Sequence, residues 1–454
     1  MYHHSARLRL GLGLIAVLGL IALAGCGSSS SSSSAGAASS SSSSSGTATA
    51  SSSAAASSAT SSCGTKPGAK ATGTPINLGS INTKQPGTDF TDISNMAAAY
   101  FACVNDNGGV NGHPIKLFQE TDQTQPAQIQ AAAKKLVQSD HVVGIVGPID
   151  LLECTIDAPY WKQLGMYEMD AGIAPECWAT PNSAAVNMGP RYSSDGAVQY
   201  ALSQHVSKIV FDQSNVPGTG YIAGGPASLA GAAHVPITQQ TENVPIQDAN
   251  SVAIKLVNDA GSNGAVVLNF TPPEALVILQ AAQKLGLEDR VKVWGCSTPC
   301  NTDFLAKALG PKWNNKLFVN AELTNPDDHN SAEFQLYDGI LKKYGTNVVG
   351  GVGSFSQMGF VMGKFATQAL ESIKGDYTVK SVNDAMVNIK DYKTDMLCKP
   401  WTYGKLALHI PNNTDYTTTP DNGKMKTAQG CFNISASDPQ IAAYRKAAAA
   451  AGLS

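Results

Sequence analysis

The 454-residue sequence is poor in charge, and the charge that it carries is almost balanced. Lysine and arginine number 31 and aspartate and glutamate 34, so the formal net charge is −3 and only 14% of the residues are charged. No basic cluster is interleaved with aromatic residues, and without a basic field a protein holds a phosphate backbone poorly. We therefore expect no nucleic-acid partner.

The motifs that identify common enzyme classes are also missing. None of the eight histidines stands in His-Glu-x-x-His spacing, and there is no Gly-x-Ser-x-Gly nucleophile turn. Neither a phosphate-binding Gly-x-x-x-x-Gly-Lys-Ser/Thr loop nor a dinucleotide fingerprint follows the first expected strand. We therefore expect no enzymatic activity and no cofactor, and an exported enzyme is the least favoured alternative.

Only one apolar run approaches membrane length, and it lies at the N-terminus. Residues 10–24 follow Arg7 and Arg9 and lead into Leu-Ala-Gly-Cys at 23–26. The run is shorter than the roughly 20 residues of a membrane-spanning helix, so it indicates a secretion signal. The last four residues resemble the bacterial lipobox, which implies that Cys26 receives a diacylglycerol and becomes the mature N-terminus. The alternative is an ordinary cleaved signal in which Cys26 is incidental.

The next segment, residues 27–73, consists almost only of Ser, Ala, Gly and Thr. Such a composition offers too little apolar area to offset the entropy lost on ordering, so we expect a disordered tether. A flexible coil of this length has an r.m.s. reach of about 40 Å. The remainder, residues 74–454, is longer than one hydrophobic core usually organises, and we expect two lobes.

Cysteine use agrees with an exported, oxidising location, because eight of the nine cysteines remain after Cys26 is set aside. We expect disulfides between residues that bracket short structural units: Cys154–Cys177, Cys296–Cys300 and Cys398–Cys431. Cys63 and Cys103 remain by elimination. The competing interpretation, in which Cys296 and Cys300 form half of a metal site, lacks a second Cys/His pair at ligand spacing. No metal is expected.

Hydrophobic periodicity predicts alternating strands and helices. The first series is a strand at 76–80, a helix at 92–105, a strand at 115–120, a helix at 127–138 and a strand at 142–147. The second places strands at 208–212, 237–244, 265–270 and 291–295, with helices at 220–233, 249–260 and 273–285 between them. Two parallel-sheet units in tandem follow from this βαβ rhythm.

Four segments together resemble the leucine/isoleucine/valine-type periplasmic binding proteins of ABC importers, which have the type I binding fold. They are the turn Asn-Gly-Gly-Val-Asn-Gly-His-Pro-Ile at 107–115, the strand end at 143–148, Ala-Pro-Glu-Cys at 174–177 and Gly-Thr-Gly at 218–220. The resemblance covers roughly residues 75–440. It implies an α/β fold of two doubly wound, Rossmann-like lobes, 74–190 plus 325–396 and 191–324 plus 397–454. Three crossing segments, near 189–191, 323–326 and 396–400, would form the hinge.

The same resemblance places the ligand in the cleft between the lobes, beyond the carboxyl ends of the strands. In the family, two loops of the first lobe hold an α-carboxylate, and a tyrosine and an acidic residue of the second lobe bind the α-amino group. This sequence departs from that pattern, because Ile173 stands where a threonine is expected and Ser297 where the acid is expected. The candidate ligand-binding residues are Phe90, Asp150, Ala171, Ile173, Tyr221, Phe270, Ser297 and Gln357.

The sequence as a whole predicts a monomeric solute-binding lipoprotein, anchored to the extracytoplasmic face of the cell membrane. It would capture a small molecule, such as an amino acid, an amide or a related polar organic solute, and deliver it to ABC permease subunits. Because Ser297 cannot supply a negative charge, we expect a ligand other than an ordinary branched-chain amino acid. A receptor-type protein that senses its ligand and signals is the alternative.

Overall fold

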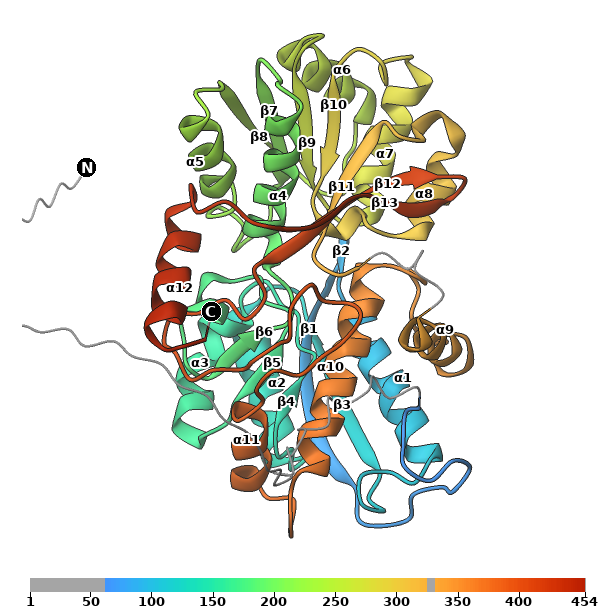
Figure 1. Cartoon of the computed structure of the whole chain (residues 1–454), viewed down its shortest axis with the longest axis vertical. Helices are drawn as coiled ribbons and strands as arrows, with labels where there is room; N and C mark the ends of the chain where they lie inside the picture. The colour runs from blue at the N-terminus through green and yellow to red at the C-terminus, as the bar shows by residue number, and fades with distance from the viewer. Residues whose placement is uncertain (1–61, 325–330, 454) are drawn as a thin grey trace, which may run out of the picture. The chain divides into compact units, whose positions relative to one another are not determined.

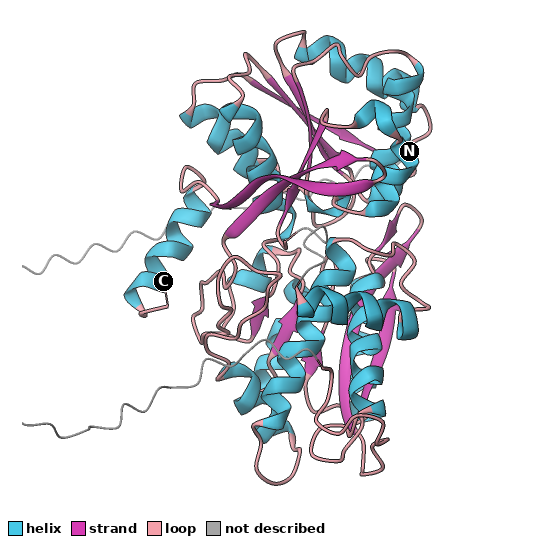
Figure 2. Cartoon of the chain, turned by 45° about the vertical axis from the view of Figure 1, so that its right-hand side comes forward, coloured by secondary structure: helices cyan, strands magenta, loops and turns pink. Residues whose placement is uncertain are grey.

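The computed structural model of the chain describes residues 62–324 and 331–453, and their strands form two separate sheets (Figures 1 and 2). The sheet of the first lobe has the order β2-β1-β4-β5-β6, with β3 also paired to β1. All its pairings are parallel except the β1–β2 hairpin. Its strands are β1 Ile76–Gln85, β2 Thr88–Asp89, β3 Ile115–Asp122, β4 Ile145–Val146, β5 Glu168–Asp170 and β6 Ser183–Ala185.

The sheet of the second lobe has the order β13-β12-β11-β10-β9-β7-β8. Strands β7 to β11 are parallel, and β12 and β13 add an antiparallel hairpin at one edge. Its strands are β7 Ile209–Ser214, β8 Ile237–Glu242, β9 Ala265–Asn269, β10 Val293–Cys296, β11 Leu317–Ala321, β12 Thr414–Asp421 and β13 Lys424–Asn433. The two parallel-sheet lobes predicted from the sequence are thus confirmed.

Helices flank both sheets. The first lobe contains α1 Asp92–Asp106, α2 Pro126–Gln138, α3 Glu153–Leu164, η1 Pro175–Trp178, α9 Ala332–Tyr344, α10 Ser354–Glu371 and α11 Val379–Val387. The second contains α4 Gly189–Ser203, α5 Gly224–Ala232, α6 Ala249–Ala260, α7 Pro272–Lys284, η2 Thr298–Cys300, α8 Asp303–Leu309 and η3 Pro311–Trp313. The last helix, α12 Pro439–Ala450, packs through Ile441 and Tyr444 in a cluster with residues of both lobes.

The sequence of β9 shows why helices cover both faces of the second sheet. Successive side chains of a strand point to opposite faces, and every residue of this strand is buried. Val266 and Leu268 pack in the cluster formed with α6 and α7, whereas Ala265 and Val267 pack in the cluster formed with α4 and α5. An apolar run without alternation therefore produces a strand that is buried on both sides.

Three connections join the lobes. The first leads from β6, which ends at Ala185, into α4, which begins at Gly189, and the second leads from β11 towards α9 through residues that are partly outside the described ranges. The third differs from the expected 396–400. The Trp401 indole donates to the Ala185 carbonyl at 3.2 Å and the Tyr403 hydroxyl to the Glu168 carbonyl at 2.8 Å. These bonds keep the chain in the first lobe beyond Tyr403, before it enters β12.

The structure contains all four expected disulfides, Cys63–Cys103, Cys154–Cys177, Cys296–Cys300 and Cys398–Cys431. Cys26 and residues 27–61 of the expected tether lie outside the described residues. Residues 62–73, which the sequence assigns to the tether, lie against α1 instead. Cys63 is bonded to Cys103, and the Lys66 and Ala71 backbone N–H groups donate to the carbonyls of Asn107 and Asn105. Within the described ranges, no helix has both the length and the apolar character to cross a membrane.

Candidate ligand-binding site

A cavity lies where the carboxyl ends of the strands of both sheets meet. Its wall includes Phe90, which follows β2, Ile149, which follows β4, and Ile173, which follows β5. From the second lobe, the ends of β7 and β9 contribute Val216 and Phe270. The cavity has a volume of about 70 Å³. This is the place where parallel α/β sheets bind ligands.

Most of the wall is apolar. The Phe90 ring meets the Phe355 ring of α10 edge to face, with a centroid distance of 5.8 Å and an interplanar angle of 87°. Phe270 is only 2% exposed, because its ring also packs in the core beside α7. The other apolar residues of the wall are Ile149, Leu151, Ile173, Pro190, Val216, Ile222, Pro299 and Met358. A ligand that fills this space gains chiefly by burying apolar surface.

Nine residues of the wall are polar, and several of them come from the hinge and from the ends of β9 and β10. The Asn269 side-chain oxygen accepts a hydrogen bond from Ser297 at 2.7 Å. The Thr298 hydroxyl accepts from the Asn320 amide at 3.3 Å. The polar residues of the wall are Thr88, Asn187, Ser193, Ser214, Thr219, Asn269, Thr271, Thr298 and Glu322. Uncharged hydroxyl and amide groups therefore make up most of the polar wall.

Glu322 is the one acidic residue of the cavity wall, and all the residues of this wall are described. It follows β11 in the second crossing segment and is 1% exposed. Burial raises the pKa of its carboxyl well above the usual value, and the nearby Asp415 carboxylate adds to the rise. Hydrogen bonds from the backbones of Met188 and Gly189 oppose the rise by favouring the ionised form. An acid thus faces the cavity from the hinge.

The two lobes touch on several sides of the cavity. The Tyr221 hydroxyl, from the second lobe, donates to the Ile173 carbonyl of the first. The Thr271 hydroxyl donates to the Gly87 carbonyl at 3.2 Å, so the β1–β2 hairpin reaches across to the start of α7. The Asp303 backbone N–H donates to the Val352 carbonyl at 3.0 Å. The two lobes are therefore in direct contact beside the cavity.

The structure brings three of the eight candidate residues, Phe90, Ile173 and Phe270, to the cavity wall. Tyr221 is not part of the wall but holds the Ile173 backbone across the cleft. Ala171 is packed in the core of the first lobe. Ser297 and Gln357 are fully buried, and each uses its side chain inside the protein. Ser297 donates to Asn269, and the Gln357 amide donates to the Thr324 carbonyl at 2.7 Å.

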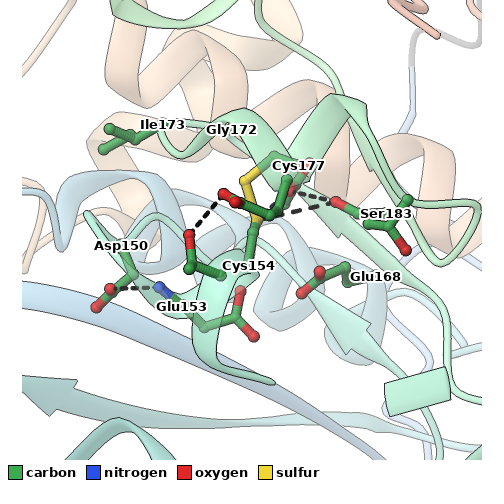
Figure 3. Close-up of a disulfide and its surroundings, with 12 residues drawn as sticks. Asp150, Glu153, Cys154, Glu168, Gly172, Ile173, Cys177 and Ser183 are labelled. Atoms are coloured by element: carbon green, nitrogen blue, oxygen red, sulfur yellow. Dashed lines mark hydrogen bonds between the residues drawn. A yellow bond between two sulfur atoms is a disulfide. The ribbon is translucent and has the colours of Figure 1, made fainter. Parts of the chain in front are cut away.

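Asp150 is likewise absent from the wall, and its carboxylate caps helix α3 (Figure 3). One oxygen accepts the backbone N–H groups of Leu152 and Glu153 at 2.7 and 2.8 Å, and the other accepts from the Thr83 hydroxyl at 3.0 Å. A carboxylate at this position satisfies N–H groups that have no partner within the helix. Asp150 therefore shapes the loop that carries Ile149 and Leu151 to the cavity.

The Cys154–Cys177 disulfide ties α3 to η1, beside the loop that carries Ile173 (Figure 3). Buried acids surround it, and burial raises the pKa of Asp170 to about 7. Glu153 and Glu168 also have pKa values well above the usual range, because both are buried and each lies close to another acid. Sulfur atoms that are already bonded to each other, next to carboxyl groups whose ionisation is disfavoured by burial, are poor metal ligands.

Sequence reasoning missed Glu322 and the hinge residues Asn187 and Gly189. Gly189 lies in a segment that the sequence marked only as a crossing between lobes, and Asn187 and Glu322 lie just before two such segments. The available signal was an acid directly after the apolar strand β11, because a charged residue at the carboxyl end of a parallel strand faces the ligand edge of the sheet. The family resemblance instead places the acid at Ser297, which directly follows the neighbouring strand β10.

Comparisons with known proteins agree with this geometry. A family model described as periplasmic binding protein matches residues 75–424. A branched-chain amino acid ABC transporter protein from Thermus thermophilus with bound valine has a TM-score of 0.69 at 16% identity, over 81% of this chain and 98% of that chain. A fatty acid ABC transporter substrate-binding protein from Thermomonospora curvata has a TM-score of 0.68 at 16% identity, over 82% and 95%.

A solute-binding protein from Rhodopseudomonas palustris BisB5, in complex with 3,4-dihydroxybenzoic acid, has a TM-score of 0.65 at 16% identity, over 79% of this chain and 98% of that chain. No curated protein matches the sequence. The structural neighbours support the same two-lobed architecture, whereas the family model matches the sequence itself over most of its length. The chain therefore belongs to the periplasmic binding protein family and has its type I fold of two α/β lobes.

Proposed function

We propose that this protein is an extracytoplasmic solute-binding lipoprotein that captures a small organic molecule between its lobes and delivers it to an ABC importer. The observation that carries the proposal is the cavity, which both lobes line at the carboxyl ends of their strands. A ligand in this position contacts both lobes at once, so binding and closure are coupled. Family membership supports the same role.

The chemistry of the wall supports binding rather than catalysis. Among its residues, all of which are described, there is no histidine, lysine or cysteine to activate a nucleophile. The Ser193 hydroxyl is engaged as an acceptor of the Thr298 backbone N–H at 3.5 Å. Hydroxyl and amide groups that no histidine, lysine or cysteine accompanies are suited to orienting a ligand.

The identity of the ligand is tested by a screen of the purified protein. We expect one class among amino acids, amides, polyols, urea-like compounds and aromatic acids to raise the melting temperature, because a ligand at 100 times its Kd adds about 2.7 kcal/mol to stability. Mass spectrometry of small molecules released from the purified protein gives an independent identification. Deletion of the gene should abolish uptake of the same compound. The import proposal fails if no compound binds and if the deletion strain takes up the co-purified molecules as fast as the wild-type strain does.

The lipid anchor is proposed for Cys26, which lies outside the described residues. Replacing it (Cys26→Ala) should release the protein from the membrane fraction, because two acyl chains give a stable attachment and the folded part offers no spanning helix within the described ranges. Cell fractionation and labelling with a radioactive fatty acid measure the effect. The matched control is Cys63→Ala, which removes a cysteine that is bonded to Cys103 and should leave the protein in the membrane. Retention of the Cys26→Ala protein would contradict the anchor.

A further inference from the structure

A second pocket lies between α12 and the segment that leads from α11 to β12. It has a volume of about 700 Å³, and it shares no wall residue with the cavity between the lobes. The Cys398–Cys431 disulfide ties this segment to β13 beside the pocket, because the neighbouring Lys399 and Asn433 are wall residues. The pocket is therefore framed by covalently joined elements, and it offers a separate place where a molecule can bind.

Three cations from different parts of the chain line this pocket. Lys390 follows α11, Lys399 lies beside the disulfide and Arg445 belongs to α12. None of them forms an ion pair with an acid among the residues that the structure describes. Asp391 is the single acid among the wall residues, all of which are described, and burial lowers the pKa of His409 to about 4, so this histidine is neutral at pH 7. Three positive charges and one negative charge leave the wall with a net charge of +2.

Two of these cations lie close enough to repel each other. Burial lowers the pKa of the Lys399 amine, and the charge of Arg445 lowers it further. Neutral oxygens hold both groups. The Lys399 amine donates to the side-chain oxygens of Asn413 and Asn433 at 3.4 and 3.2 Å, and the Arg445 guanidinium donates to the Ile434 carbonyl. These bonds leave one N–H group of the lysine and several of the arginine without a partner among the described residues.

The unused donors are open to a solute. Lys399 is exposed and Arg445 is half-buried, and both side chains belong to the pocket wall. An anion in the pocket would accept hydrogen bonds from both groups and would offset the repulsion between them. The charge and the free donors of the wall therefore favour an anionic ligand.

We propose that this pocket binds a dianionic phosphate group, carried by a soluble phosphate monoester or by a lipid headgroup. The site goes beyond solute capture between the lobes and does not depend on the ligand of the cleft. A phosphate monoester carries a charge of about −1.5 to −2 at pH 7 and three strong acceptor oxygens, which matches the charge of the wall. The fork of Arg445 suits two of these oxygens, and Lys399 adds a point charge. The apolar wall residues Ile410, Pro411 and Leu453 can pack against the body of the ester.

The first test compares two anions that have the same ring and different charge. Phenyl phosphate and benzenesulfonate are titrated calorimetrically into the purified protein at pH 8 and low ionic strength, where the phosphate is a dianion and the sulfonate a monoanion. We expect phenyl phosphate to bind at one site per chain and about 10- to 100-fold more tightly than benzenesulfonate, the ratio that an additional charge-assisted hydrogen bond provides. Equal affinities, or no binding of phenyl phosphate, would overturn the proposal.

Two variants then locate the site. Lys399→Gln and Arg445→Gln each remove one charge from the wall, so we expect each to weaken phenyl phosphate binding about 10-fold or more while thermal unfolding remains cooperative. The matched control is Lys446→Gln, which removes the same charge from α12 outside the pocket wall and should bind as the wild type does. Because Lys399 is exposed, its replacement should leave the fold intact. Unchanged affinity in Lys399→Gln would therefore refute the assignment even if Arg445→Gln unfolds.

The source of the phosphate group is decided by two further titrations. Dihexanoyl phosphatidic acid, below its micelle concentration, is compared with glycerol 3-phosphate, which presents the same phosphate without acyl chains. Affinity that is at least about 10-fold higher for the phosphatidic acid assigns a lipid headgroup, because the acyl chains then contribute by burying apolar surface. Equal or higher affinity for glycerol 3-phosphate assigns a soluble ester, and both results support the site. If neither compound binds, the pocket is not a phosphate site.

Discussion

Removing the charge of Asp438 tests how α12 is held to the rest of the protein. Asp438 begins this helix and accepts the Gln440 backbone N–H at 2.9 Å. Both of its oxygens also accept from Arg191 of α4, and the two side chains are 0% and 8% exposed. The change Asp438→Asn keeps a side-chain oxygen that can cap the helix, so it removes the ion pair and spares the cap.

The size of the stability loss depends on Arg191, whose charge stays buried after Asp438 is changed. Breaking a buried ion pair by removing one partner costs about 3–5 kcal/mol, because the other charge stays buried without compensation. Here Arg191 retains its bond to the Tyr221 carbonyl, and the buried Asp195 lies close enough for the charges of Arg191 and Asp438 to affect its pKa. Both features reduce the loss in the free energy of unfolding. We therefore expect Asp438→Asn to lower the free energy of unfolding by about 3 kcal/mol, at the lower end of that range.

Urea unfolding followed by tryptophan fluorescence measures this effect, since all five tryptophans are buried. The midpoint should fall with an unchanged m value. The double variant Arg191→Met, Asp438→Asn should be less destabilised than Asp438→Asn, because it leaves no unpaired charge. The control Asp421→Asn breaks an exposed pair with Lys426 and should cost less than about 1 kcal/mol. A loss below about 1 kcal/mol in Asp438→Asn would refute the reasoning.

Three further predictions concern the cavity, the bridges and pH. Phe270→Leu keeps an apolar side chain but loses the ring, so calorimetry should show ligand affinity reduced about 3- to 10-fold, while the melting temperature falls only by the cost of a slightly smaller core side chain; equal affinity would exclude a ring contact. Replacing Cys154 and Cys177 by serine should lower the free energy of unfolding, measured in urea, by about 2–4 kcal/mol. Replacing Cys296 and Cys300 should lower it less, because these two cysteines are 4 residues apart in sequence and the first two are 23 apart, so the second bridge closes a much shorter loop. The ligand-free protein should melt at a lower temperature at pH 8 than at pH 5, and the opposite trend would contradict the buried acids. Burial is the largest cause that raises the pKa of these acids, to about 7 for Asp157, Asp170 and Asp212 and to about 8 for Asp122. The stability that each protonated acid contributes is therefore fully present below the unfolded pKa near 4, and it is lost as the pH rises through the folded pKa.

Much of the fold was predictable because it depends on local signals. The buried runs of β7 and β9, separated by amphipathic α6, have the pattern of a parallel sheet. The turn at 107–114 was also readable, since Gly108, Gly109, Asn111 and Gly112 all have positive φ. The third crossing was misplaced, because nothing local shows that Trp401 and Tyr403 donate to carbonyls of the first lobe.

The site was less predictable than the fold. Phe90, Ile173 and Phe270 could be found because each follows a strand, and strand ends gather at the cleft. Whether such a residue lines a cavity or packs in a core depends on its neighbours in space. The neighbours of Ala171 place it in the core of the first lobe and not in the cavity wall. Asp150 offered two roles, and helix capping is the one that the structure shows. Glu322 was overlooked because a hinge segment has no periodicity from which a side-chain direction can be inferred.

The Cys63–Cys103 bridge has a mechanical consequence. It fastens the first part of the folded body to α1, in the lobe that contains β1 to β6. Any pull transmitted along the preceding chain therefore enters the first lobe through a covalent bond, and it bypasses the hydrogen bonds of residues 66–73. The bridge itself makes no connection to the second lobe, so the load first reaches the lobe that contains α1.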